Sequence, residues 1–359
     1  MPRLAVAYLA VLAALRLTLA SPEGCTEPTA DALADAAARA AVWLAEGQKP
    51  DGSYLYVADR SGRDLGGYNE VRHAGVMLSL YQAGELAAAD AGLDWAIDHL
   101  EPVDDGQALA LHGRASVGGA ALLVAALAER RAQTGDPVHD DRMRDLGRFL
   151  VSMQRADGGF VVSLNPATGV RDLEGTSRYY PGEALWALAR LEAIFPDEPW
   201  DEAVRAAATF IATRRDAVEN VIAPPLNDHW AAYGFAEMAA WDDLDDDVAR
   251  YARLLYGRFA LLIRTESKRD AAPVAILHGP ERRAAALGTW VEGQAALGRL
   301  AALDGRLADL EDRIVTSARC GTGVLVARQE ADGAWYAQGE TRMDDQQHAI
   351  SGLLAVAAL

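Results

Sequence analysis

The sequence lacks the short motifs that mark a metal, nucleotide or redox centre. It has only two cysteines, Cys25 and Cys320, and no Cys-x-x-Cys pair. It also has no His-Glu-x-x-His spacing, no glycine-rich phosphate loop and no dinucleotide fingerprint. We therefore expect no metal and no cofactor. A site built from His73, His229 and His348 stays open as an alternative.

Positive charge is scarce as well. The 34 lysines and arginines are outnumbered by 52 aspartates and glutamates, which gives a formal net charge of −18. Nucleic acids and anionic membranes would repel such a chain, so neither is expected as a partner. β-Branched residues are sparse and Ala, Leu and Arg abundant, which favours helices. No proline- or serine-rich linker divides the chain, so residues 21–359 are predicted to form one domain.

Long apolar runs are absent except near the start of the chain. Arg3 precedes an apolar run from Leu4 to Leu15, and Thr18-Leu19-Ala20 offers small residues at cleavage positions. Residues 1–20 therefore resemble a secretory signal peptide, although Arg16 interrupts the pattern. The run is too short for a stable membrane span. We expect a secreted or periplasmic protein, with lipid attachment at Cys25 as an alternative for which the preceding residues are a poor match.

Helical periodicity recurs in six pairs of segments. The expected pairs are 30–46 with 69–83, 87–99 with 115–131, 141–154 with 181–194, 201–214 with 229–241, 245–264 with 284–303, and 307–329 with 344–359. The last pair carries an expected break near Gly321-Thr322-Gly323. First members are amphipathic and charged, and second members are small and apolar. This alternation predicts an all-α fold, a single (α/α)6 toroid with an outer and an inner ring.

The two cysteines fall in neighbouring parts of such a ring. Cys25 precedes the first helix, and Cys320 lies in the last hairpin. A closed ring brings the first and last hairpins together, so we hypothesise a disulfide between Cys25 and Cys320 that holds the ring shut.

Three outer segments end in a common pattern of Gln, Asp-Gly and an aromatic residue. The pattern reads Gln48-Lys49-Pro50-Asp51-Gly52-Ser53-Tyr54, Gln154-Arg155-Ala156-Asp157-Gly158-Gly159-Phe160 and Gln329-Glu330-Ala331-Asp332-Gly333-Ala334-Trp335. Asp-Gly ends a helix because glycine adopts the left-handed conformation cheaply. The pattern resembles the repeat motif of terpenoid cyclases and protein prenyltransferases, and Asp-Gly followed by an aromatic residue also occurs in six-hairpin glycosidases. Both resemblances imply an α/α toroid.

Polar and aromatic residues gather at the starts of five of the six inner segments. These starts read Tyr68-Asn69-Glu70-Val71-Arg72-His73, Arg178-Tyr179-Tyr180-Pro181-Gly182-Glu183, Asn227-Asp228-His229-Trp230, Thr289-Trp290-Val291-Glu292 and Arg342-Met343-Asp344-Asp345-Gln346-Gln347-His348. A polar residue on a buried helix is costly unless it is paired or faces a wet cavity. The shared position therefore predicts one ligand-binding cleft, although caps and ion pairs explain any single residue equally well. The remaining inner start, Ala115-Ser116-Val117-Gly118, adds little.

The residue types in this cleft suit a sugar. Aromatic rings stack on sugar faces, and paired carboxylates supply the acid and base for glycoside cleavage. Glu183 is the expected acid or base, because Tyr179, Tyr180 and Pro181 would raise its pKa by desolvation. Asp228 or Asp344 is the expected partner. Together with the toroid resemblance, this implies a secreted carbohydrate-active enzyme of glycosidase or epimerase type.

We expect a small-molecule or glycan ligand. Three arginines at the same helix starts, Arg72, Arg178 and Arg342, suggest the hypothesis that this ligand is anionic, for example an acidic sugar. Salt bridges explain them equally well. Two other functions stay open, a terpenoid-cyclase- or prenyltransferase-like toroid enzyme and a non-catalytic toroid that binds glycans or peptides. The string Asp243-Leu244-Asp245-Asp246 matches a terpenoid-cyclase motif, but it lies in an acidic run at an outer-helix start, facing away from the cleft.

Overall fold

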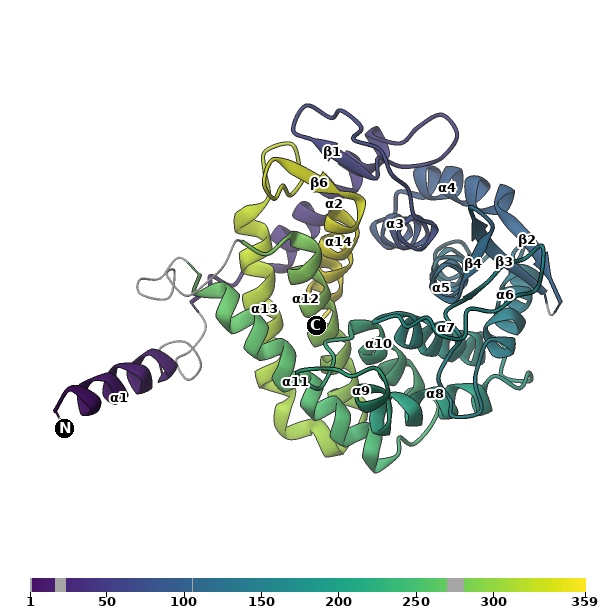
Figure 1. The fold of residues 1–359 in the computed structure, drawn as a ribbon. Helices are drawn as coiled ribbons and strands as arrows, with labels where there is room; N and C mark the ends of the chain where they lie inside the picture. The colour runs from purple at the N-terminus through teal and green to yellow at the C-terminus, as the bar shows by residue number, and fades with distance from the viewer. Residues whose placement is uncertain (1, 17–23, 105, 270–280) are drawn as a thin grey trace.

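The computed structural model describes residues 2–16, 24–104, 106–269 and 281–359. Twelve long helices in this part of the chain form two concentric rings (Figure 1). The outer helices are α2 (Ala30–Glu46), α4 (Leu86–Asp98), α6 (Asp140–Ser152), α8 (Asp201–Thr213), α11 (Asp246–Ser267) and α13 (Glu311–Arg328). The inner helices are α3 (Glu70–Ala83), α5 (Val117–Thr134), α7 (Tyr180–Ile194), α10 (His229–Met238), α12 (Ala284–Leu303) and α14 (Met343–Ala357).

Each inner helix packs against the next, and α14 returns to contact α3, so the inner ring is closed. The predicted (α/α)6 toroid is therefore confirmed, with each predicted helix present and its ends shifted by a few residues. Inner helices close-pack because their buried faces are rich in alanine and glycine, which allow helix axes to approach. Buried apolar residues from both rings form one continuous hydrophobic core.

Short strands and two short helices lie between the long helices. Strand β1 (Val57–Asp59) pairs antiparallel with β6 (Glu340–Arg342). Strands β2 (Leu100–Val103), β3 (Gly106–Leu111), β4 (Arg114–Ser116) and β5 (Ser163–Leu164) form an antiparallel sheet in that order. Helix α9 (Arg215–Val218) and the 3-10 helix η3 (Gly305–Leu310) lie between longer helices. Strands β4 and β6 end directly before the inner helices α5 and α14, so they help to fix where those helices start.

The expected break in the last outer helix is wrong, because α13 continues without interruption. Its glycines serve close packing instead of a turn. A Cβ atom on Gly321 would lie 2.5 Å from Val291 Cγ2, and one on Gly323 would lie 2.0 Å from the carbonyl oxygen of Thr26. Glycine therefore lets α13 approach both α12 and the segment that precedes α2.

The three Gln/Asp-Gly motifs link neighbouring outer helices. Gln48 Nε2 donates to the Gly52 carbonyl (3.0 Å) and to that of Ala88 in α4 (2.9 Å). The equivalent side chain of Gln154 reaches Ala203 in α8, and that of Gln329 reaches Ala36 in α2. The motif's aromatic residues are buried. The Gln/Asp-Gly motif therefore has a structural role, as its helix-ending turn predicts.

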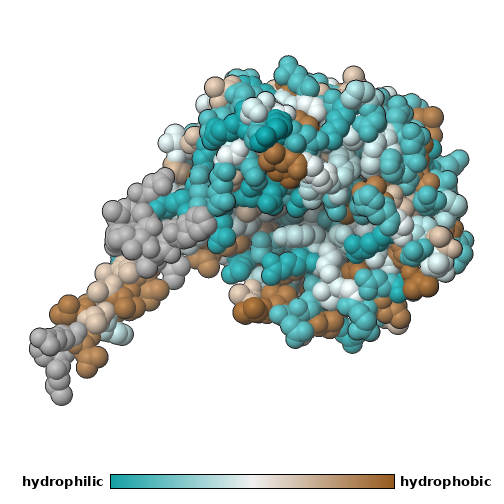
Figure 2. Space-filling model, turned by 45° about the horizontal axis from the view of Figure 1, so that its top comes forward, coloured by the Kyte–Doolittle hydropathy of each residue, from teal (hydrophilic) through white to brown (hydrophobic). Residues whose placement is uncertain are grey.

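The N-terminal helix α1 (Pro2–Leu15) stands apart from the ring (Figure 1). Its apolar side chains from Leu4 to Leu15 are largely exposed, and Figure 2 shows this brown surface beside the mostly hydrophilic ring. The expected cleavage positions 18–20 lie outside the described residues. No helix among the residues described is long and apolar enough to cross a membrane.

A disulfide joins Cys25 to Cys320 of α13, with 5.3 Å between their Cα atoms. It ties the segment before α2 to the last outer helix, at the place where the two ends of the toroid meet. Because the Cys25 sulfur is engaged in this bond, lipid attachment at Cys25 does not fit the structure.

Candidate active site

The starts of the inner helices surround a cavity of about 610 Å³, here called the central cavity. All six inner helices or the loops before them contribute to its wall. Its lining residues are Asn69, Val71, Arg72, Leu122, Ser177, Tyr179, Tyr180, Glu183, His229, Trp230, Glu281, Arg282, Arg283, Ala285, Ala286, Thr289, Asp344, Gln347 and His348. A cleft thus lies on the face where the polar helix starts converge, and half of the expected cleft residues line it.

Two histidines of the cavity wall meet one buried glutamate. Glu292 Oε2 lies 2.8 Å from His348 Nδ1 and 3.7 Å from His229 Nε2. The two imidazole rings are perpendicular, with centroids 5.0 Å apart. Glu292 is buried just behind the wall, where its Oε1 accepts a hydrogen bond from the Tyr233 hydroxyl (3.4 Å). One buried carboxylate therefore serves two imidazoles that line the cavity.

The protonation states follow from burial. Burial raises the pKa of Glu292, while His348 and its hydrogen bond oppose the change. Burial, and then the proximity of His348, lowers the pKa of His229 well below its ordinary value. His229 is therefore a neutral imidazole near pH 7, and neither of its ring nitrogens has a hydrogen-bond partner among the described residues. Such a group is available to accept a proton from a ligand.

The same three side chains are of the types that bind divalent cations, and their ligand atoms lie within 4.8 Å of one another. A metal-bound histidine normally donates its second N–H to an acceptor, which fixes its ring. Neither nitrogen of His229 has such an acceptor in the part of the chain that the structure describes. We therefore interpret the cluster as an acid–base group. His73, the third histidine considered above, lies elsewhere.

Glu183 occupies the first turn of α7 and lines the cavity although only 4% of its surface is exposed. Burial raises the pKa of its carboxyl well above the ordinary value, with Asp228 adding to the change and Arg215 opposing it. Its Oε2 atom has no hydrogen-bond partner among the described residues. Glu183 thus lies at the cavity wall with a raised pKa, which favours the protonated carboxylic acid.

Gly118 makes room for this acid. A Cβ atom there would lie 2.4 Å from Glu183 Oε2 and 2.5 Å from Tyr180 Cε1. The start of α5, which looked uninformative in the sequence, therefore contributes by the absence of a side chain.

We predict that Gly118→Ala destabilises the protein by about 1–3 kcal/mol, because the new methyl group overpacks the site. Urea unfolding measures the change. Gly257→Ala is the matched control, since a Cβ on that helical glycine meets nothing within 4 Å among the described residues. Equal stability of Gly118→Ala and wild type would show that Glu183 lies elsewhere.

A second prediction concerns pH. The raised pKa means that folded Glu183 holds its proton more tightly than the unfolded chain does. Its contribution to stability is full below the unfolded pKa of 4.5 and is lost as the pH rises toward the folded pKa. Glu183→Gln should therefore gain stability relative to wild type as the pH rises from 4.5 toward 8, by about 1.4 kcal/mol per pH unit until the folded pKa is reached. Urea unfolding across this range tests it, and a pH-independent difference would contradict it.

Asp228 was expected in the cleft as a partner of Glu183. It is instead fully buried and does not line the cavity. It caps α10 by accepting hydrogen bonds from the backbone N–H groups of Trp230 (3.0 Å) and Ala231 (3.3 Å). Its other oxygen pairs with the fully buried guanidinium of Arg215, which also donates to the carbonyl of Arg178. Both oxygens are engaged, so Asp228 positions the start of α10.

Asp344, the other expected partner of Glu183, does line the cavity. Its Oδ2 lies 3.2 Å from Arg72 Nη2, and its Oδ1 has no hydrogen-bond partner among the residues described. The Arg72 guanidinium also donates to the Tyr56 hydroxyl (2.6 Å). Arg72 thus orients a carboxylate of the cavity wall whose second oxygen is buried and unpartnered among the described residues.

Several other expected cleft residues instead hold helix starts in place. The Tyr68 hydroxyl donates to His73 Nδ1 (2.6 Å), and His73 Nε2 donates to the Gly92 carbonyl (2.8 Å). Burial lowers the pKa of His73 to about 3, so it stays neutral. Glu70 accepts a hydrogen bond from the Ser116 hydroxyl (2.6 Å), which links α3 to α5. None of Tyr68, Glu70 and His73 lines the cavity.

The starts of α12 and α14 are held in a similar way. Asp345 pairs with Arg283 and accepts hydrogen bonds from the N–H groups of Ala285 (3.1 Å) and Arg342 (3.0 Å). Trp290 is buried in the core. Four residues that were expected in the cleft therefore do not line the cavity: Arg178, Trp290, Arg342 and Asp345.

The rejected acidic string also lies away from the cavity. Asp245 and Asp246 begin α11, and Asp246 pairs with Arg306 at 2.8 Å. Asp243 and Leu244 line a separate hollow together with Asp304 and Arg306.

Comparison with known proteins was made by sequence and by structure. No protein-family model matches the chain, and no curated protein matches its sequence. An unsaturated glucuronyl hydrolase specific for heparin superposes with a TM-score of 0.64 at 11% identity, over 91% of this chain and 97% of that chain. A cellobiose 2-epimerase from Spirochaeta thermophila gives 0.62 at 15% identity, over 88% and 93%.

A D-mannose isomerase gives a TM-score of 0.62 at 11% identity, over 92% of this chain and 97% of that chain. These similarities support no terpenoid-cyclase-like alternative. At such low identities they establish architecture alone. The chain therefore has an (α/α)6 toroid fold, the architecture that this glucuronyl hydrolase, this epimerase and this isomerase also have.

Proposed function

We propose that this protein is a carbohydrate-active enzyme that binds a sugar in the central cavity and moves protons through His229, Glu292 and His348. The observation that carries the proposal is the shared carboxylate. Glu292 Oε2 lies within 3.7 Å of a nitrogen of each imidazole, and both imidazoles line the cavity. The neighbouring folds of sugar hydrolases, epimerases and isomerases support the same class of substrate.

The geometry suits epimerisation or isomerisation of an open-chain sugar. Neutral His229 removes the proton from the carbon beside the carbonyl, and the C–H electrons form an enediolate. A proton delivered by His348, which is hydrogen-bonded to Glu292, returns to the same carbon in epimerisation. In isomerisation the proton goes to the former carbonyl carbon, and the hydroxyl proton of the deprotonated carbon moves to the former carbonyl oxygen. No oxidant, reductant or further group is consumed.

Glycoside hydrolysis is the second candidate function. Glu183 has a raised pKa, which favours its protonated form. Glu183 Oε2 and Asp344 Oδ1 both lie at the wall of the same cavity and have no hydrogen-bond partner among the described residues. Glu183 would protonate the leaving oxygen, and Asp344 would act as base or nucleophile. This assignment keeps the carboxylate chemistry that the sequence indicated and replaces Asp228.

An anionic sugar fits the electrostatics of the cavity best. The starts of six inner helices direct their positive dipole ends toward it. Arg72, Arg282 and Arg283 also line its wall. Arg72 pairs with Asp344 and Arg283 with Asp345, which leaves Arg282 for an anionic group. We further propose that the protein is exported, which residues 1–20 and the Cys25–Cys320 disulfide support, since such bonds persist in oxidising compartments.

One experiment separates the two reactions. The purified protein is incubated in D2O with neutral and uronic monosaccharides and disaccharides, and the products are followed by NMR. Proton transfer predicts deuterium at the carbon beside the carbonyl without loss of chain length. Hydrolysis predicts shorter products whose new anomeric oxygen comes from ¹⁸O-labelled water. Absence of binding and turnover for every sugar tested would refute both.

A further inference from the structure

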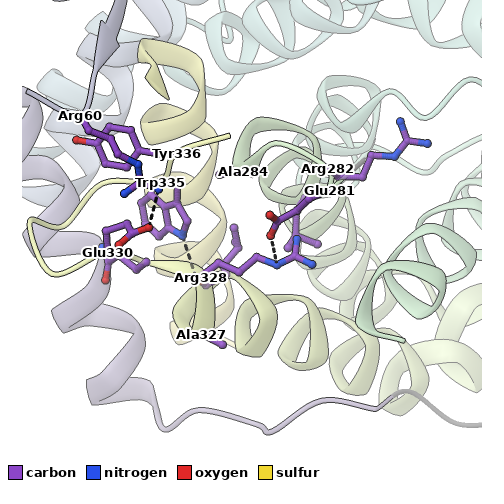
Figure 3. Close-up of a pocket in the computed structure, with 12 residues that line it drawn as sticks. Arg60, Glu281, Arg282, Ala284, Ala327, Arg328, Glu330, Trp335 and Tyr336 are labelled. Atoms are coloured by element: carbon purple, nitrogen blue, oxygen red, sulfur yellow. Dashed lines mark hydrogen bonds and ion pairs between the residues drawn. The ribbon is translucent and has the colours of Figure 1, made fainter. Parts of the chain in front are cut away.

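A second pocket, here called the rim pocket, lies beside the central cavity (Figure 3). Its volume is about 320 Å³, and it lies among the start of α12, the end of α13 with the following turn, and Arg60 beyond β1. Figure 3 shows Tyr336 and Arg60 on one side of it and Glu281 with Arg282 on the other.

The two pockets adjoin. Glu281 and Arg282 line both of them, so the segment that enters α12 is their common wall. A ligand longer than one sugar unit that lies in the central cavity can therefore continue past Arg282 into the rim pocket. Together they offer about the space that two or more linked sugar units need.

The rim pocket is chemically suited to a sugar. The Arg60 guanidinium lies 4.7 Å from the centre of the Tyr336 ring and pairs with Glu330 at 3.0 Å. Arg328 Nε pairs with Glu281 at 2.9 Å. These ion pairs fix donors and acceptors around the pocket without a large net charge, as recognition of sugar hydroxyls requires.

Arg282 differs from the other cations of the rim pocket. Its side chain is exposed and makes no ion pair or side-chain hydrogen bond within the described part of the chain. It therefore offers an uncommitted guanidinium at the junction of the two pockets. Such a group binds carboxylates and sulfates in bidentate fashion.

We propose that the rim pocket is a subsite for a second sugar unit, and that Arg282 binds an anionic substituent of the glycan at the junction. The inference rests on the proposed function and deepens it, because it assigns a glycan of two or more units as the ligand. Tyr336 and Arg60 contact the distal unit, while the reacting unit lies in the central cavity.

The test is calorimetric binding of uronic acid mono-, di- and trisaccharides, and of their neutral counterparts, to the full chain. Wild type should bind the best disaccharide at least tenfold more tightly than its monosaccharide. Tyr336→Ala should remove this gain and leave monosaccharide affinity unchanged. Arg282→Ala should remove the preference for uronic over neutral disaccharides, and Arg282→Lys should restore part of it.

Arg319→Ala is the control, since Arg319 is an exposed arginine of α13 outside both pockets. Equal affinity for one, two and three units would overturn the rim subsite and leave the proposed function standing. An unchanged uronic preference in Arg282→Ala would overturn the role of that residue. If no sugar in the set binds, both the inference and the proposed function fail.

Discussion

Glu292→Gln is expected to lower kcat by about 10²–10⁴-fold, the usual contribution of a positioned acid–base group. Glutamine preserves the volume of the side chain and can still accept the Tyr233 hydrogen bond. It removes the carboxylate that lies 2.8 Å from His348 Nδ1 and with it the proton-accepting partner of that imidazole. KM should change little, because Glu292 lies behind the wall and does not line the cavity.

Steady-state kinetics on the best sugar substrate measure this effect, with thermal unfolding to show that the variant is folded. Glu237→Gln is the matched control, since it changes a carboxylate farther along α10 that lies outside the central cavity. A folded Glu292→Gln variant with at least half of the wild-type kcat would remove His348 and Glu292 from the mechanism. The Glu183-based hydrolysis would then be the remaining candidate.

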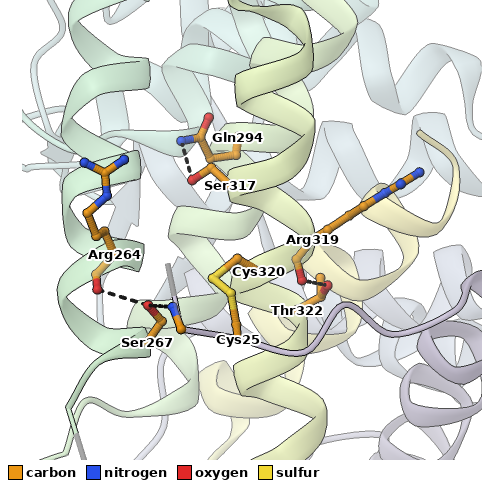
Figure 4. Close-up of a disulfide and its surroundings, with 9 residues drawn as sticks. Cys25, Arg264, Ser267, Gln294, Ser317, Arg319, Cys320 and Thr322 are labelled. Carbon is orange, nitrogen blue, oxygen red and sulfur yellow. Dashed lines mark hydrogen bonds between the residues drawn. A yellow bond between two sulfur atoms is a disulfide. The ribbon is translucent and has the colours of Figure 1, made fainter. Parts of the chain in front are cut away.

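Removal of the disulfide is expected to lower the free energy of unfolding by about 2–5 kcal/mol. The bond links residues 295 positions apart, so it restricts the unfolded chain over most of its length. It also fastens the segment before α2 to α13, beside Gln294 and Ser317 (Figure 4). A toroid that is closed by packing alone would open at this place first.

Urea unfolding of Cys25→Ser, Cys320→Ser and the double variant measures the loss. The three variants should be equally destabilised, since each breaks the same bond, and a reducing agent should bring wild type to their level. A loss below about 1 kcal/mol would show that contacts between α14 and its neighbours α2 and α3 are sufficient to close the ring.

The sequence determined the architecture well because two signals repeat. Alternation of amphipathic and small-residue helices separated the outer from the inner ring. The Gln/Asp-Gly motif marked three outer-helix ends, and its Gln48 contact with Ala88 shows why the motif recurs. A helix break was wrongly predicted at Gly321–Gly323, because glycine is typical both of helix breaks and of close contacts between helices. Only the tertiary structure distinguishes the two.

The site was less predictable, because periodicity locates a helix start but not the direction of each side chain. His229, His348 and Glu183 were predicted from their residue types at inner-helix starts, and all three line the central cavity. Asp228 was misplaced because a capping aspartate and a catalytic one occupy the same sequence position. Arg215 was missed because it lies in a four-residue helix that no repeat predicts.

The residues that enter the cavity before α12 were missed for a related reason. Arg282 and Arg283 precede the periodic segment, so only the folded loop shows that they reach the wall. Gln347 was overlooked because it is neither charged nor aromatic, although it lies beside Gly75 of α3. A search of the residues immediately before each inner helix would have found the two arginines.

A crystal structure of Glu292→Gln soaked with the best-binding sugar tests the central claim most directly. We expect the sugar in the central cavity, with its reacting carbon next to the edges of His229 and His348 that line the cavity and its ring beside Trp230. A sugar bound only at another place on the ring, with the central cavity empty, would contradict the assignment of this cavity as the active site.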